Sequence, residues 1–100
     1  MIYYILDKGV PRAVESEEWL DWMETNPDRT VAKTVVGEVE ISTVFLSLNH
    51  NFGFYGSPIL YETMIFGGEH DQYQERYTAL EDAMLGHNRA VILAGGMIVG

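Results

Sequence analysis

The strongest constraint on the fold is a pair of β-rich segments separated by only two residues, Gly37 and Glu38. The segments run from Val31 to Val36 and from Val39 to Leu48, and their valine, isoleucine, threonine and phenylalanine residues favour strands. Strands joined by so short a connection pair antiparallel, because a parallel pair needs a crossover of a dozen or more residues. The sequence therefore predicts a β-hairpin in the middle of the chain.

Two further β-rich segments flank this hairpin, from Ile2 to Leu6 and from Ile59 to Phe66. The first is followed by the turn-forming sequence Asp-Lys-Gly and the second by Gly67 and Gly68, and both patterns mark reversals of the chain. Strands that follow one another through mostly short connections usually pair. We therefore expect an antiparallel sheet of about four strands.

Two segments have the spacing of helices. A short helix is expected after the first strand, from about Glu17 to Glu24, with Ser16 as its N-cap. A second helix is expected after Thr78, which has Glu81 three residues later as in a capping box. Apolar residues then recur on one side of this C-terminal helix, so we expect it to lie across one face of the sheet.

The composition fits a single α+β domain over residues 1–100, of which 47% are hydrophobic. The chain has no cysteine, which excludes disulfides and thiolate catalysis and fits the cytoplasm. The first apolar run is too short for a signal peptide, and no run approaches the roughly 18 apolar residues of a membrane span. We therefore expect a cytoplasmic protein that does not enter a membrane.

The charge of the chain is strongly acidic. Fifteen acidic and six basic residues give a formal net charge of -9, which repels phosphate backbones and anionic lipid surfaces. We therefore expect no direct binding to nucleic acid. Such a charge keeps a small protein soluble, and it also suits a basic partner protein.

Three parts of the sequence are similar to a known group of proteins: Ser42 to Leu46 leading to Asn49 to Gly53, Leu60 to Gly68, and Arg76 to Thr78 leading to Gly86 and His87. They resemble short uncharacterised proteins of bacteriophages, prophages and some bacterial genomes. The resemblance covers roughly residues 30–91. It implies a phage-type accessory protein, and it brings no established activity and no assigned catalytic residues.

The loop between the hairpin and the fourth strand is a candidate ligand-binding site. Glycines in such a loop allow close approach of the backbone, aromatic rings stack on planar groups and amides donate hydrogen bonds. The alternative is a loop whose aromatic residues only cover one end of the sheet. The candidate ligand-binding residues in the loop are His50, Asn51, Phe52, Phe54 and Tyr55.

Glu62 and His87 complete the predicted site. His87 lies on the apolar side of the second helix, and Glu62 shares strand parity with Leu60 and Met64. If that parity faces the core, the carboxylate and the imidazole form the polar floor of a pocket under the aromatic loop. If the parity is reversed, Glu62 faces solvent and His87 is a hydrogen-bonded core histidine. Both alternatives are open from the sequence.

Our main functional hypothesis is a non-enzymatic phage-type accessory protein that acts by binding. As a counter-defence factor it would sequester a small polar, nucleotide-like ligand or block a host protein. One alternative is a small acid–base or metal-dependent enzyme that uses His50, Glu62 and His87, and another is a structural or assembly component.

The main hypothesis includes no cofactor and no metal, because none of the histidine spacings is diagnostic of a metal site. Trp19 and Trp22 lie in the short predicted helix, and a small domain with such a helix has apolar surface left over. We therefore also expect a homodimer.

Overall fold

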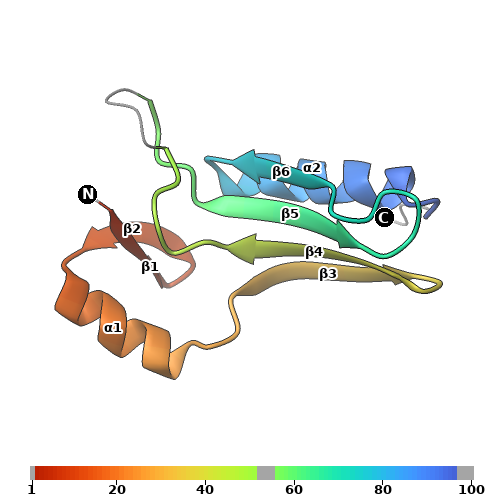
Figure 1. The fold of residues 1–100 in the computed structure, drawn as a ribbon. Helices are drawn as coiled ribbons and strands as arrows, with labels where there is room; N and C mark the ends of the chain where they lie inside the picture. Colours follow the sequence, from red (N-terminus) through yellow and green to blue (C-terminus); the bar gives the residue numbers. More distant parts are fainter. Residues whose placement is uncertain (1, 52–55, 97–100) are drawn as a thin grey trace.

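The computed structural model describes residues 2–51 and 56–96 and confirms the α+β class (Figure 1). One antiparallel sheet has the strand order β3-β4-β5-β6, and the C-terminal helix packs on it. Neither helix of the described residues is long and apolar enough to cross a membrane. The elements are β1 (Tyr3–Asp7), β2 (Val10–Val14), α1 (Ser16–Thr25), β3 (Thr30–Val36), β4 (Val39–Phe45), β5 (Tyr61–Phe66), β6 (Gln74–Tyr77) and α2 (Leu80–Leu93).

The predicted central hairpin is confirmed as β3 and β4. The two strands close on the pair Val36 and Val39, and Gly37 between them has a φ of 60°, which glycine adopts readily because it lacks a Cβ atom. The register of β3 shifts between Thr30 and Ala32. This irregularity is a bulge at the start of the strand.

The strands of the sheet differ from those that the sequence predicts. The segment from Ile2 to Leu6 does form a strand, β1, but β1 pairs with β2 in a separate two-stranded sheet. The fourth place in the main sheet belongs to β6. Neither β2 nor β6 is predicted, because edge strands are short and rich in proline and charged residues, which do not favour strands in a sequence. β2 contains Pro11 and Arg12, and β6 is Gln-Glu-Arg-Tyr.

The core lies between α2 and one face of the main sheet, which we call the inner face; the opposite face is the outer face. Side chains alternate along each strand, and every second residue of β4 and β5 is buried. Small residues of α2 pack against them. The buried residues of this interface are Ile41, Thr43 and Phe45 of β4, Tyr61, Thr63 and Ile65 of β5, and Ala83, Gly86, His87, Ala90 and Val91 of α2.

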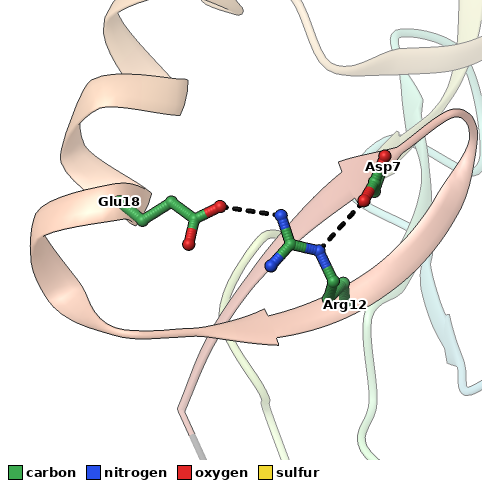
Figure 2. Close-up of polar contacts among 3 residues, drawn as sticks. All are labelled: Asp7, Arg12 and Glu18. Atoms are coloured by element: carbon green, nitrogen blue, oxygen red, sulfur yellow. Dashed lines mark hydrogen bonds and ion pairs between the residues drawn. The ribbon is translucent and has the colours of Figure 1, made fainter.

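The N-terminal hairpin and α1 form a unit that Arg12 holds together at its surface. Arg12 Nε donates to Asp7 at 3.1 Å and its Nη2 donates to Glu18 at 2.7 Å, so that the side chain joins both strands to the helix (Figure 2). The indole of Trp19 donates to the carbonyl of Ser47 at 3.1 Å, in the segment after β4. The unit is thereby attached to the end of the main sheet.

The two predicted helix caps are wrong. The N-cap of α1 is Glu15, not Ser16, and the N-cap of α2 is Ala79, not Thr78. Neither cap residue makes a side-chain hydrogen bond to the helix. The short segment between β6 and α2 places the first helical residue at Leu80, one position later than a capping box at Thr78 requires.

Ala79 therefore offers a position at which the protein can be stabilised. Its backbone is extended (φ -121°, ψ 148°), which is the geometry in which an aspartate or serine side chain accepts from the first-turn amides. Ala79→Asp should raise the free energy of unfolding by about 1 kcal/mol. Thr78→Ala is the control and should leave the denaturation midpoint unchanged. If Thr78→Ala lowers the denaturation midpoint and Ala79→Asp leaves it unchanged, Thr78 and not Ala79 is the N-cap.

Candidate functional site

His87 lies at the centre of a buried polar network beneath α2. Its Nδ1 is hydrogen-bonded to Thr43 Oγ1 at 2.8 Å, and its Nε2 to Thr34 Oγ1 at 2.9 Å. Thr43 Oγ1 is in turn hydrogen-bonded to Thr63 Oγ1 at 2.5 Å. Burial lowers the pKa of His87 because it disfavours the charged imidazole. His87 is thus a hydrogen-bonded core histidine, and both of its ring nitrogens are engaged by threonines.

Glu62 lies on the opposite face of the sheet from His87. The buried residues of β5 are Tyr61, Thr63 and Ile65, so Glu62 between them points to the outer face. There it accepts a hydrogen bond from Arg76 Nε at 2.8 Å and another from Gln74 Nε2. The pocket with Glu62 and His87 as its floor is therefore wrong, because a strand directs adjacent side chains to opposite faces.

The predicted binding loop is described only in part. His50 Nδ1 is hydrogen-bonded to the carbonyl of Leu48 at 2.9 Å, and Asn51 Nδ2 donates to the carbonyl of Ser57 at 3.0 Å. Asn49 Oδ1 accepts from the amides of Asn51 and Ile59 at 2.8 and 3.1 Å and so joins the two sides of the loop. Phe52, Phe54 and Tyr55 lie outside the described residues.

These placements bear on the enzyme hypothesis. His50 belongs to the segment between β4 and β5, His87 is buried on the inner face, and Glu62 is on the outer face. Over residues 2–51 and 56–96 no group of three or more histidine or acidic residues is arranged to hold a metal ion. The structure therefore does not bring the proposed acid–base or metal set together.

A groove along β6 brings together a different set of residues. It has a volume of about 440 Å³ and lies between β6 and α2. On the helix side it is lined at positions 82, 85 and 89, whose spacing puts them on one face of α2. The lining residues are Ile59, Glu75, Arg76, Tyr77, Thr78, Asp82, Leu85 and Arg89. We call this site the β6 groove.

An ion pair crosses the β6 groove from strand to helix. Arg89 Nη2 donates to Glu75 Oε1 at 2.6 Å, and the Tyr73 hydroxyl donates to Glu75 Oε2 at 3.1 Å. The hydrogen bond from Arg89 holds the pKa of Glu75 below its usual value. The carboxylate therefore stays ionised at neutral pH and ties α2 to the edge strand.

Tyr77 forms the inner wall of the β6 groove. Its ring is buried, and burial raises the pKa of its phenol to about 12. The hydroxyl is enclosed near Thr63 and Glu75 but has no hydrogen-bond partner in the described part of the chain. The ring fits beneath α2 only because residue 86 is glycine: a Cβ atom there would overlap the Tyr77 phenol. The contact of Gly86 with Tyr77 therefore sets how closely α2 approaches β6.

The β6 groove is not predicted from the sequence because β6 itself is not predicted. The signal that identifies it is the alternation of Tyr73, Glu75 and Tyr77 with Gln74 and Arg76, which places the tyrosines on one face and the two polar residues on the other. This alternation is short and contains no aliphatic residue, so the segment resembles a polar turn.

The comparisons with known proteins give no relative for this chain. No protein-family model matches it, and no curated protein or solved structure matches it.

The buried His87 should make the stability of the protein depend on pH. The pKa of His87 in the folded protein is lower than its ordinary value of 6.5, so near and below that pH the unfolded chain binds a proton that the folded protein does not. Stability should be greatest above about pH 6.5 and fall as the pH is lowered, by up to about 1.4 kcal/mol per pH unit.

The measurement is the urea midpoint at about pH 7.5 and about pH 5.5. His87→Gln should be less stable at the higher pH, because it loses the threonine contacts, but should lose less stability on acidification. His70→Gln is the control, since residue 70 lies in the segment between β5 and β6 and takes no part in the threonine network. An equally steep loss on acidification in His87→Gln would show that another group is responsible.

The contact of Gly86 with Tyr77 predicts an unusual effect of alanine in a helix. Gly86→Ala should lower the free energy of unfolding by about 1 to 3 kcal/mol, because the added methyl group overpacks the core, although alanine is the better helix former. The control is Asn88→Ala at an exposed position of α2, which should be neutral or slightly stabilising. A Gly86→Ala variant as stable as wild type would mean that α2 does not pack this closely.

Proposed function

We propose that this protein acts by binding another protein, as a non-enzymatic accessory factor of the phage type. The observation that carries the proposal is the β6 groove, which combines exposed Leu85 and half-buried Ile59 with the charged groups of Arg76, Asp82 and Arg89. A groove that mixes apolar and charged side chains is typical of recognition sites.

Of the two modes of binding that the sequence suggests, blocking of a host protein is better supported than sequestration of a small ligand. The β6 groove is lined by Glu75, Arg76 and Tyr77 of β6, which is the last strand of the sheet, so it lies at an edge that a protein segment can approach. The acidity of the chain, with its net charge of -9, favours encounter with a basic protein surface. In this role the protein would be a counter-defence factor that acts in the cytoplasm of a bacterial or infected host cell.

The test compares two exposed leucines. Leu85 lies in the β6 groove and Leu20 lies on α1, and their exposed fractions are similar, 59% and 55%. A partner captured from bacterial lysate by wild type and by Leu20→Glu should be lost with Leu85→Glu, because a carboxylate would be placed in the groove. Direct binding of the purified partner to the three proteins then measures the loss.

Native mass spectrometry of the same three proteins distinguishes the two modes. A bound small molecule that disappears with Leu85→Glu would favour sequestration of a ligand, whereas a protein complex that disappears favours blocking. Equal recovery of the partner by all three proteins would show that the β6 groove is not the binding site.

A further inference from the structure

The outer edge of β6 has main-chain groups available for pairing. The carbonyls of Tyr73 and Tyr77 accept from the amides of Ile65 and Leu60 at 3.1 and 3.0 Å, so these residues turn their main chain toward β5. In an antiparallel pair this orientation alternates along the strand. The amide and carbonyl groups of Gln74 and Arg76 therefore point away from the sheet, and β6 is the last strand of the sheet order.

The other edge of the sheet, β3, is built differently. Its register shift between Thr30 and Ala32 is a bulge, and Lys33 lies in the same strand. Bulges and lysines are common devices that prevent an edge from pairing with another chain. The register of β6 with β5 runs from Tyr77 to Gln74 without a shift. The two edges therefore differ in regularity: β3 contains a bulge, whereas β6 is short and charged but keeps a regular register.

The β6 groove lies directly beside this edge and suits the side chains of an added strand. Every second side chain of such a strand would point to the inner face. There it would meet Leu85 of α2, with Tyr77 and Ile59 as neighbours. Because β6 has only four residues, main-chain pairing alone is limited to the two outward residues. Side-chain contacts in the groove must therefore supply much of the affinity and the specificity.

The charges of the groove favour a basic strand. Arg76 is paired with Glu62 at 2.8 Å and Arg89 with Glu75 at 2.6 Å, so the two arginines are already neutralised. Asp82 is the lining residue whose charge has no ion pair within residues 2–51 and 56–96. The local excess charge is therefore negative, like that of the whole chain, and is complementary to a lysine or arginine of the partner.

We infer that β6 accepts an extended, basic segment of the partner protein as a fifth strand of the sheet, with apolar side chains at alternate positions in the β6 groove and a basic side chain near Asp82. This inference rests on the proposed function and specifies the chemistry of the partner. Its physical basis is the coincidence, at one edge, of an adjoining groove with main-chain groups and a carboxylate that have no partner among residues 2–51 and 56–96.

The probe is a short synthetic peptide of alternating valine and lysine, followed by NMR of the amides of the labelled protein. The amides of Gln74 and Arg76 should shift and become protected from exchange, whereas the outward amide of Val35 on β3 should not. A matched peptide of valine and glutamate should bind roughly tenfold more weakly or worse, because it meets Asp82 with a like charge. Equal binding of the two peptides would overturn the basic partner.

Methylation of the peptide tests main-chain pairing without any change in the protein. One face of a strand's main chain pairs with β6, so N-methyl groups on one set of alternate residues should abolish binding and those on the other set should not. If both methylated peptides bind as well as the parent, the segment is not an added strand. Failure of the unmethylated valine–lysine peptide to bind would also refute the inference.

Proline variants test the same edge from the protein side. Arg76→Pro removes an outward donor at an edge, where proline is tolerated, and should weaken peptide binding by roughly tenfold or more. Val35→Pro on β3 is the matched control and should bind like wild type. If Arg76→Pro keeps full affinity while Leu85→Glu loses it, the groove binds its partner without strand addition, so the proposed function stands and this inference fails. A wild-type dimer that Arg76→Pro dissociates would assign the edge to a second copy instead.

Discussion

The close approach of α2 to the sheet is the contact on which the rest of the structure depends. It is made by residues with little or no side chain, since Ala83, Gly86 and Ala90 are all buried in the interface. At Gly86 the Tyr77 ring occupies the space of the missing Cβ atom. This contact fixes where β6 lies beneath the helix. Glu75 of β6 and Arg89 of α2 also form an ion pair. The helix and the edge strand are therefore held together both by the packing of Tyr77 on Gly86 and by this pair of charges.

The interface also contains polar groups that are costly to bury singly, and they satisfy one another. Thr34, Thr43 and Thr63 approach from three adjacent strands, and His87 and Thr43 link them. A buried hydrogen-bonding group without a partner destabilises a fold by about 1 to 3 kcal/mol. The network therefore specifies the register of α2 on the sheet, because a shift of the helix by one residue would separate the imidazole from both hydroxyls. This role accounts for His87 without any catalytic function.

Features of this structure that depend on neighbouring residues are predictable from the sequence, whereas features that depend on tertiary packing are not. The β3–β4 hairpin is predicted correctly because Gly37 and the flanking valines act locally. The orientation of Glu62 is not predictable, because β5 has apolar residues at both parities and only the docking of α2 selects the threonine-bearing face. The strand β6 is missed because an edge strand needs few apolar residues, and the β6 groove is missed with it.

The β6 groove is a consequence of the same packing that builds the core. The helix contacts all four strands of the main sheet, β6 among them, and the groove lies where α2 and β6 meet. Tyr77 fills the part nearest the helix, and the space beyond it remains as the groove. A larger residue at position 86 would push α2 away from β6, because the Tyr77 ring occupies the space of its side chain. The small residue that stabilises the core therefore also leaves an edge strand and a recess side by side, which is the geometry that an added strand requires.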